Sequence, residues 1–576
     1  MEPYPSWPNL PAMMFGLARK WPDRPMLRVF RDGAWQRITW AAFARMAASC
    51  ARRLLAAGVA PGDRVLICAE NRPEYAIAET ALMAIRAVPV PAYTTNTAED
   101  HAHILRDSGA RAAIVSSATL AGRVREAGRQ SGGLDLLVVM DGPTEADGGA
   151  HPRVLRWAEL VADRAAPDDI ARGAETIPGT ALACVLYTSG TGGSPKGVML
   201  PHRSIQSNCH GAYELLQDIG VSIGAKNQVY LSYLPASHSY EHTVGLFFLP
   251  SVGTEIVYAR GVEHLAADML TAKPTILTAV PRVLEVIRAR ILAQAAREPA
   301  WKQALFRRAL EIGMRRLDGG RLSLADRLLD PVLDRLVRAK IRGRFGGRLI
   351  GAVSGGARLE PDVGRFYLAL GIKIVQGYGQ TEAGPVISAN PPNAIRVETV
   401  GRALRGVDLR IAEDGEILVR GDLVMDGYWG RPAETAAAIR DGWLHTGDIG
   451  ELDADGYLRI TDRKKDIIVL SGGENVSPAK IEGMLMAEPE IAQAVISGDG
   501  HPALNALVVP ADGYDDVAVA LAVSRVNKRL SVTERIRRHA VVLAFTLENG
   551  LLTPTQKIRR LHVLRANADT LERMRA

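Results

Sequence analysis

The sequence has 576 residues, 47% of them hydrophobic and 23% charged, which is typical of folded globular proteins and too long for one hydrophobic core. The formal net charge of +7 is concentrated in residues 286–348, which hold 16 Lys and Arg against 6 Asp and Glu, while the rest of the chain sums to −3. No nucleic-acid-binding motif accompanies this charge, so we expect no nucleic-acid partner. The four cysteines are scattered, which argues against a zinc site and a disulfide framework. The N-terminus does not read as a secretory signal, and no run of 18 apolar residues could form a membrane-spanning helix. We therefore expect a cytoplasmic location.

Short apolar strands alternate with amphipathic helices over residues 25–180, and the same alternation returns at 228–285 and 349–390. Repetition of strand, helix and strand indicates parallel sheets with helical crossovers, so we predict an α/β fold. The clearest predicted strands lie at 64–68, 112–115, 349–354 and 373–376, and the clearest predicted helices at 75–87 and 360–370.

A glycine-rich loop follows the apolar strand predicted at 181–186, because residues 187–198 read YTSGTGGSPKGV. Glycines let backbone amides approach an anion, hydroxyl groups add donors and Lys196 adds a positive charge, so the loop suits a polyphosphate. It is not a Walker loop, because its lysine follows Pro195 rather than a glycine. A surface turn that binds nothing is the alternative. The residues assigned to the nucleotide here are Thr188, Ser189, Gly190, Thr191, Gly192 and Gly193.

The basic segment 286–348 alternates apolar and cationic residues at helical spacing. One interpretation is a set of solvated helices with arginine-rich faces. The other is attraction to an anionic membrane surface, to which each exposed cation contributes about 1 kcal/mol. Peripheral contact with the cytoplasmic face of a membrane through this segment is therefore one of two hypotheses.

Two glycine turns follow predicted strands farther along, Ser-Gly-Gly-Ala at 354–357 and Gln-Gly-Tyr-Gly-Gln-Thr-Glu at 376–382. Because ligands bind beyond the carboxyl ends of parallel strands, both turns should open on the face of the glycine-rich loop. Tyr378 can stack on a base, Thr381 can donate to a phosphate, and Glu382 can hold Mg²⁺, which prefers carboxylate and phosphate oxygens. The alternatives are a core aromatic for Tyr378 and a helix-start acid for Glu382. The nucleotide residues assigned here are Gly355, Gly356, Ala357, Gln376, Gly377, Tyr378, Gly379 and Thr381.

Shorter strands and frequent turns predict a β-rich subdomain at about 400–461. It contains Asp448, a carboxylate able to accept hydrogen bonds from ribose hydroxyls, and Arg463 can share that task. The charged run Thr-Asp-Arg-Lys-Lys-Asp at 461–466 is typical of an exposed linker. Lys557 lies in a predicted loop, where a solvated lysine is the alternative. We predict a large N-terminal domain of parallel-sheet subdomains at 1–461, a hinge linker at 462–467 and a small α+β domain at 468–576.

These motifs resemble, in order and context, those of the acyl-adenylate-forming enzymes, which include acyl-CoA synthetases, firefly luciferase and nonribosomal adenylation domains. The chain looks most like long-chain fatty acyl-CoA synthetases, through Leu-Pro-Ala-Ser-His-Ser-Tyr-Glu at 234–241 and the long basic insert. The resemblance extends over roughly residues 25–565, and its nucleotide motifs are 187–196, 376–382, 443–448, 461–466 and 553–557.

The resemblance implies two half-reactions. A fatty carboxylate attacks the α-phosphate of MgATP to give acyl-AMP and pyrophosphate, and the thiol of CoA then displaces AMP. Lys557 would contact the transferring phosphate and the carboxylate. Thr188 and Glu382 would hold Mg²⁺, and Thr381 and Lys196 would contact the phosphates.

The resemblance also implies that the small C-terminal domain is mobile and rotates about Lys465 between the half-reactions. Lys465 is assigned to the nucleotide as well. That rotation would withdraw Lys557 and bring Gly472 and Gly473 to the CoA side. His238 would lie at the junction of the acyl and CoA tunnels, where a gating role and a packing role are equal alternatives.

One residue departs from the family pattern: Gly192 stands where the loop usually has a second threonine, so one hydroxyl donor is lost and weaker contact with ATP is expected. Two rival functions remain. A fatty acyl-AMP ligase would load a carrier protein instead of CoA, but no extra insertion is evident near 385–470. A noncatalytic nucleotide-binding regulator is the other rival, against which Lys557, Glu382, Asp448 and Arg463 are all present.

Overall fold

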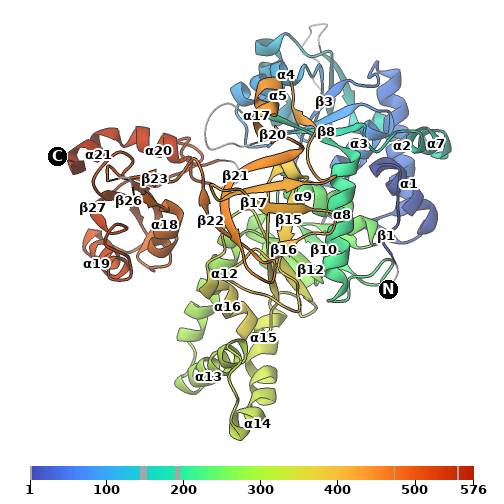
Figure 1. Cartoon of the computed structure of the whole chain (residues 1–576). Helices are drawn as coiled ribbons and strands as arrows, with labels where there is room; N and C mark the ends of the chain where they lie inside the picture. The colour runs from blue at the N-terminus through green and yellow to red at the C-terminus, as the bar shows by residue number, and fades with distance from the viewer. Residues whose placement is uncertain (1–2, 143–151, 189–194, 473, 554–556, 576) are drawn as a thin grey trace. The chain divides into compact units, whose positions relative to one another are not determined.

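The computed structural model describes residues 3–142, 152–188, 195–472, 474–553 and 557–575 (Figure 1). The chain divides into two compact units, the first made of residues 1–187, 196–408 and 419–444 and the second of residues 188–195, 409–418 and 445–576. The predicted hinge linker and the domain boundaries beside it stay predictions.

A five-stranded parallel sheet forms part of the first unit, in the order β4-β3-β5-β6-β7. The strands predicted at 64–68 and 112–115 are β3 and β5, with the predicted bounds. The helix predicted at 75–87 is α3, which starts earlier because Pro73 fits the first turn of a helix. The elements of this region are α1 (Leu10–Lys20), α2 (Trp40–Ala56), β3 (Arg64–Cys68), α3 (Pro73–Ala84), β4 (Val88–Pro91), α4 (Ala98–Ser108), β5 (Ala112–Val115), α5 (Ala118–Ser131), β6 (Leu136–Val139), β7 (Arg153–Arg156), α6 (Trp157–Leu160) and α7 (Asp168–Glu175).

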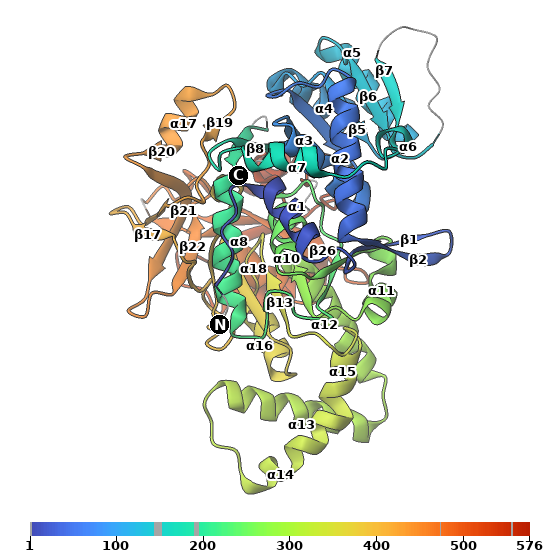
Figure 2. The same cartoon turned by 90° about the vertical axis from the view of Figure 1, so that its right-hand side faces the viewer.

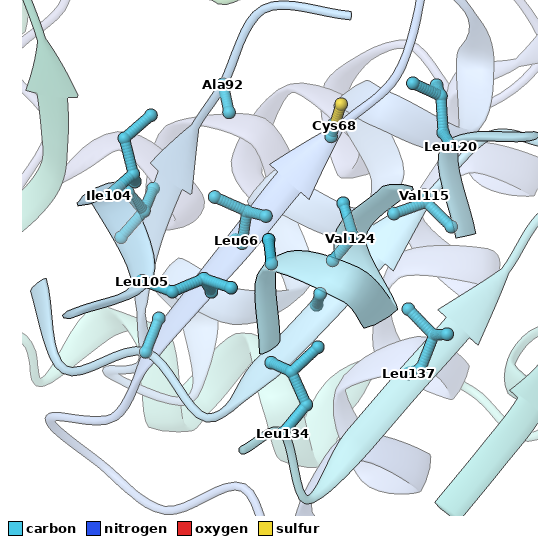
Figure 3. Close-up of a cluster of buried hydrophobic side chains, with 14 of the residues drawn as sticks. Leu66, Cys68, Ala92, Ile104, Leu105, Val115, Leu120, Val124, Leu134 and Leu137 are labelled. Atoms are coloured by element: carbon cyan, nitrogen blue, oxygen red, sulfur yellow. The ribbon is translucent and has the colours of Figure 1, made fainter. Parts of the chain in front are cut away.

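Helices α4 and α5 pack on this sheet over a continuous apolar core. In Figure 3, Leu66 and Cys68 of β3 and Val115 of β5 lie beside Leu105 of α4 and Val124 of α5, and all five side chains are buried. Strands covered on both faces are largely apolar, which explains why β3 and β5 are recognisable in the sequence as short apolar runs.

A nine-stranded sheet is the centre of the first unit, in the order β16-β15-β14-β13-β12-β10-β11-β1-β2. Its pairs from β14 to β1 are parallel, and its edge strands are antiparallel. The strands predicted at 349–354 and 373–376 are β13 and β14, with α16 between them in the chain, so the loops after β12, β13 and β14 begin at one edge of the sheet. The elements are β1 (Pro25–Arg31), β2 (Ala34–Thr39), α8 (His202–Gln217), β10 (Val229–Ser232), α9 (Ser239–Thr243), η1 (Val244–Phe248), α10 (Leu249–Ser251), β11 (Glu255–Tyr258), η2 (Val262–His264), α11 (Leu265–Ala272), β12 (Ile276–Ala279), β13 (Gly351–Ser354), α16 (Pro361–Ala369), β14 (Ile374–Gly379), η4 (Thr381–Ala383), β15 (Val386–Ala389) and β16 (Arg402–Ala403).

A helical excursion separates β12 from β13 and contains the basic segment. In Figures 1 and 2, α13 and α14 extend away from the nine-stranded sheet. They share a small core of Ala309, Ile312 and Leu333. Among the helices that the structure describes, none is both long and apolar enough to cross a membrane. The elements are α12 (Pro281–Ala296), α13 (Ala300–Leu317), α14 (Leu324–Leu333), η3 (Asp334–Arg338), of π-helical type, and α15 (Ala339–Gly343).

Two further sheets have antiparallel pairs, and the second consists of strands between residues 408 and 463. The boundaries of the β-rich subdomain stay a prediction. The first sheet has the order β19-β9-β8. The second has the order β17-β18-β21-β20, with β22 paired to β21. The elements are β8 (Leu182–Tyr187), β9 (Gly197–Pro201), β17 (Asp408–Ile411), β18 (Glu416–Arg420), β19 (Gly427–Tyr428), α17 (Pro432–Ala438), β20 (Ile439–Arg440), β21 (Trp443–Leu452) and β22 (Leu458–Arg463).

The C-terminal part of the second unit is an α+β fold, as predicted. Its sheet, β25-β26-β27, has one antiparallel and one parallel pair, and Ile481 of α18 and Val519 of α19 belong to the core against it. The elements are β23 (Ile468–Val469), β24 (Asn475–Val476), α18 (Pro478–Met486), β25 (Ile491–Ser497), β26 (Leu504–Pro510), α19 (Asp516–Asn527), β27 (Ile536–Val541), α20 (Arg560–Ala566) and α21 (Ala568–Arg575).

Candidate active site

Tyr428 brings together two charged residues that the sequence assigned to MgATP. Its hydroxyl donates to Glu382 Oε1 over 2.9 Å, and the Lys196 ammonium lies 5.0 Å from the centre of its ring. Burial and the adjacent Glu382 carboxylate raise the pKa of Tyr428, so the phenol keeps its proton and remains a donor. Lys196 also forms an ion pair with Glu434, and its hydrogen bond lowers the pKa of the Glu434 carboxyl. Strand β19, helix η4 and the residue before β9 therefore place a carboxylate and an ammonium on one tyrosine.

The short helix η4 presents Thr381 and Glu382 immediately after β14. Thr381 Oγ1 lies 3.1 Å from Ser239 Oγ, a hydroxyl at the start of α9. The turn before η4 requires glycine at 379, because a Cβ there would lie 1.9 Å from the carbonyl oxygen of Pro385. This close backbone approach fixes the position of the backbone from which Thr381 and Glu382 extend.

The loop after β13 meets the side chain of Tyr240. Tyr240 donates to the carbonyl oxygen of Val353 over 3.0 Å, and a Cβ at Gly355 would lie 3.4 Å from the Tyr240 ring. Gly356 has a φ of +82°, a conformation that favours glycine, and it is exposed together with Ala357. The backbone of Gly356 and Ala357 is therefore exposed, directly after the buried Gly355.

The β14 residues assigned to the base are partly covered. Gln376 is buried and its carbonyl accepts from the Asn390 amide over 2.9 Å. Gly377 pairs with Ala389, and Tyr378 pairs with Ser388. Tyr378 is only 8% exposed, which favours packing over base stacking for its ring in this conformation.

His238 caps the N-terminus of α9 rather than facing solvent. Its Nδ1 accepts from the Tyr240 amide over 3.2 Å, and its side chain is half-buried. This contact gives His238 a structural role in the fold. Gating by His238 stays a prediction.

In the second unit, the candidate ribose residues face each other across two antiparallel strands. Asp448 of β21 is the register partner of Arg463 of β22, and Arg463 Nε lies 3.2 Å from Asp448 Oδ1. Asp448 is 5% exposed, and its amide donates to Thr446 Oγ1 over 3.2 Å. Thr446 in turn donates to the Ile417 carbonyl over 2.7 Å. The carboxylate is therefore held in place by its partners before any ligand binds.

The segment predicted as an exposed linker differs from that expectation at its start. Asp462 and Arg463 belong to β22, and Asp462 is only 6% exposed, because the strand continues through the first half of the charged run. Burial raises the pKa of the Asp462 carboxyl. Lys464 Nζ lies 2.6 Å from Asp414 Oδ2 and 3.1 Å from Glu416 Oε2, whereas the proposed pivot Lys465 is exposed.

A β-bridge closes the loop that carries Lys557. Leu552 pairs with Ile558, and the Lys557 amide donates to Thr553 Oγ1 over 3.0 Å. Thr553 is fully buried, and Lys557 is half-buried. These two contacts hold the backbone at Lys557 in place.

Several assigned residues lie at or beyond the limits of the described structure. Thr188 is described and half-buried at the end of β8, and Gly472 is exposed. Ser189, Gly190, Thr191, Gly192, Gly193 and Gly473 lie outside the described residues.

Sequence reasoning missed Tyr428, Glu434 and Ser239. Tyr428 follows Gly427 in a two-residue strand, and Glu434 lies in the first turn of α17. Neither position has a sequence pattern that distinguishes it from a packed aromatic or a helix-start acid. Ser239 stands inside the 234–241 motif, which was the available signal.

The residues present fit Mg²⁺ bound through nucleotide phosphates. Across the described residues, no group of three or more His, Cys, Asp or Glu side chains is arranged to hold a metal by itself. Mg²⁺ commonly takes one or two protein carboxylates and completes its shell with phosphate oxygens and water. Glu382, whose Oε1 accepts from Tyr428, is the carboxylate that would fill this role.

Comparison with known families gives two matches. Residues 16–429 match the AMP-binding enzyme family, and residues 465–576 match the AMP-binding enzyme C-terminal domain.

Two relatives match nearly the whole chain. Long-chain-fatty-acid–CoA ligase FadD15 of Mycobacterium tuberculosis is 34% identical over 600 aligned residues, which cover 98% of this chain and 96% of the relative. The chloroplastic long-chain-fatty-acid–[acyl-carrier-protein] ligase AEE15 of Arabidopsis thaliana is 26% identical, over 96% of this chain and 85% of the relative.

Solved structures share the fold. O-succinylbenzoate coenzyme A synthetase (MenE) from Bacillus subtilis, in complex with ATP and magnesium ion, has a TM-score of 0.70 at 21% identity, covering 96% of this chain and 98% of that chain. This likeness confirms the predicted α/β architecture with a separate C-terminal domain.

Proposed function

Because the chain belongs to the AMP-binding enzyme family, we propose that it is a fatty acid–CoA ligase that acts on long-chain fatty acids. It would first form acyl-AMP and pyrophosphate from a fatty acid and ATP, and then transfer the acyl group to CoA. The near-full-length similarity to FadD15 supports the substrate class. The geometric observation that carries the proposal is the meeting of Glu382 and Lys196 on Tyr428.

The first half-reaction converts a poor acyl donor into a mixed anhydride. A carboxylate oxygen of the fatty acid bonds to the α-phosphorus, and the bond from that phosphorus to the bridging oxygen of pyrophosphate breaks. Catalysis of this step is mostly alignment and charge neutralisation. Mg²⁺, when bound with ATP, neutralises phosphate charge; Glu382 and Thr188 are the residues proposed to hold it. We assign Lys196 and Thr381 to the phosphates and Lys557 to the carboxylate and α-phosphate.

Lys196 would exchange one anion for another when ATP binds. In this structure its ammonium pairs with Glu434, and both side chains are more than one third exposed. An exposed pair of this kind contributes little to stability, so phosphate oxygens can replace the carboxylate at small cost. The pair therefore keeps the lysine near Tyr428 without fixing it there.

In the second half-reaction, sulfur of CoA bonds to the acyl carbonyl carbon, the bond from that carbon to the AMP oxygen breaks, and the thiol proton leaves to solvent or a base. We propose that the C-terminal region rotates about Lys465 between the steps, with Gly472 and Gly473 on the CoA side. Asp448 and Arg463 are proposed to hold the ribose. Their pairing would place the Asp448 carboxylate to accept from both hydroxyls.

Release of pyrophosphate tests the function. Purified protein with MgATP and palmitate should release pyrophosphate, and adding CoA should give palmitoyl-CoA. Absence of fatty-acid-dependent release would leave the noncatalytic regulator as the correct function.

A carrier protein is the second candidate acceptor, which the similarity to AEE15 favours. Parallel reactions with CoA and with a phosphopantetheinylated carrier protein separate the two. Acyl-AMP formed in both, with thioester on the carrier protein alone, would contradict the CoA ligase and establish the alternative.

A further inference from the structure

An apolar stripe runs along the outer helix of the excursion between β12 and β13. Leu324, Leu328, Val332 and Leu336 recur every four residues through α14 and into η3, with exposed fractions of 78%, 79%, 49% and 45%. At about 3.6 residues per turn, four-residue spacing drifts slowly around a helix, and the wider π-helical turn of η3 reduces the drift. These four residues, here called the leucine stripe, share one side of the helix.

The opposite side of the same helix is acidic and fully engaged. Asp326 and Asp330 are buried, and Arg308 and Arg315 pair with Asp326 while Arg338 pairs with Asp330 at 2.8 Å. Asp334 likewise pairs with Arg342 at 2.8 Å. The acids of α14 and η3 thus face α13 and α15. They do not neutralise positive charge on the side of the helix that carries the leucine stripe, here called the outer side.

Cations flank the leucine stripe. Arg321 precedes α14, Arg327 lies beside Leu328, and Arg335 lies beside Leu336; all three arginines are exposed. The outer side therefore combines exposed apolar groups with exposed positive charge, and both views show α13 and α14 extending away from the nine-stranded sheet (Figures 1 and 2).

We propose that the leucine stripe docks this protein on an anionic lipid bilayer. Leucine side chains would enter the boundary between headgroups and acyl chains, and the flanking arginines would contact anionic headgroups, as in other interfacial amphipathic helices. Charge selects this occupant over a second copy of the chain, because two identical stripes facing each other would bring Arg321, Arg327 and Arg335 against their equivalents. The inference goes beyond the proposed function and stands without it.

Vesicle sedimentation tests the proposal on the full-length protein. The wild type should sediment with vesicles of phosphatidylglycerol and phosphatidylcholine, weakly with phosphatidylcholine alone, and less as NaCl is raised. The double variant L324Q/L328Q removes the two most exposed side chains of the leucine stripe and should bind at least about tenfold more weakly. The charge variant R327E/R335E should lose binding to anionic vesicles by a similar factor.

The control is V517Q/L521Q, which changes an apolar pair at the same four-residue spacing on α19, with exposed fractions of 68% and 58%. It should bind vesicles as the wild type does. Circular dichroism should show the same helix content in all variants, because every changed side chain is exposed. Equal loss of binding in the control, or no binding of the wild type to anionic vesicles, would overturn the proposal.

Sedimentation velocity without lipid identifies the rival occupant. A wild type that self-associates, with L324Q/L328Q monomeric at the same concentration, would show that the leucine stripe joins two copies and would overturn the lipid proposal. A monomeric wild type that binds anionic vesicles supports it. Neither readout requires enzymatic activity, so this proposal and the ligase function can fail independently.

Discussion

At the scale of single residues, Tyr428 is a positioning residue for the proposed nucleotide site. It touches Glu382 through its hydroxyl and Lys196 through its ring, and it lies in a strand that is paired with β9, the strand that follows Lys196. A hydrogen bond to a charged group contributes about 1.5–3 kcal/mol. Loss of that bond would leave Glu382 free to turn away from the bound phosphates.

Tyr428→Phe should therefore raise the Mg²⁺ concentration needed for half-maximal pyrophosphate release by about tenfold or more. Excess Mg²⁺ should restore much of the rate, because the carboxylate itself remains. Glu382→Gln should not be rescued in this way. Tyr514→Phe, at an exposed tyrosine of the second unit, is the control. An unchanged Mg²⁺ dependence in Tyr428→Phe would show that the hydroxyl does not position Glu382.

Glu241 is a carboxyl whose environment favours its neutral form. It is 1% exposed and accepts from the Tyr230 hydroxyl, from Ser232 Oγ over 2.6 Å and weakly from Thr278 Oγ1 over 3.4 Å. Burial raises its pKa from 4.5 to about 7, despite these hydrogen bonds. In the unfolded chain the carboxyl loses its proton near pH 4.5, whereas the folded protein keeps it until about pH 7.

The free energy of unfolding should consequently fall as pH rises through this window, by about 3 kcal/mol from this group. Glu241→Gln should remove that fall, so its stability relative to the wild type should improve between pH 5 and pH 8. Guanidinium titrations followed by tryptophan fluorescence measure this in the first unit, because all 8 tryptophans lie there. If the free energy of unfolding changed with pH in the same way in both proteins, the buried neutral carboxyl would be contradicted. Glu263→Gln, at an exposed position, is the control.

At the scale of elements, the β14 turn determines where η4 starts. Gly379 is the last residue of β14, and the register of the β14–β15 pair shifts between Tyr378 and Gly379. The backbone of Pro385 occupies the space that a Cβ at residue 379 would need. A side chain cannot enter that contact without moving a strand. The two residues of η4 that are assigned to MgATP therefore depend on one glycine before them.

Gly379→Ala should displace the β14–β15 turn and reduce pyrophosphate release by at least about 100-fold, because misplacement by about 1 Å at a reacting centre has that effect. Far-UV circular dichroism should stay close to that of the wild type. Gly122→Ala is the matched control: it lies in α5 with no atom within 4 Å of the new Cβ, and it should keep full activity. Activity of Gly379→Ala near that of the control would show that the turn tolerates the shift.

At the scale of the whole molecule, the assigned chemistry is divided between the two units. Lys196, Thr381 and Glu382 belong to the first unit, and Asp448 and Lys557 belong to the second. The proposed mechanism assigns Lys557 to the activation of the acid alone. The transfer to CoA needs no ammonium on the α-phosphate, since AMP is already the leaving group.

Lys557→Ala should abolish acyl-AMP formation, measured as pyrophosphate release, while preserving palmitoyl-CoA formation from supplied palmitoyl-AMP. Lys528→Ala, an exposed lysine of the second unit, should affect neither step. Equal losses in both half-reactions of Lys557→Ala would contradict a role confined to the first.

The sequence by itself determined the local features of this protein. Strands covered on both faces are continuous apolar runs, so β3 and β5 could be predicted to the residue. Strand β22 was harder: its charged residues Asp462 and Arg463 resemble a linker, and only pairing with β21 shows why they lie in a sheet. The glycine turns and charged motifs likewise follow from residue type and order alone.

Only the tertiary structure decided which distant residues meet. Nothing local distinguishes Tyr428, Glu434 or the leucine stripe from ordinary packed or solvated side chains. Their roles come from sheet pairing and helix packing, which set neighbours across large separations in the chain. The physical reason is that backbone propensity acts over a few residues, whereas burial, ion pairing and exposure depend on what the rest of the folded chain places beside each side chain.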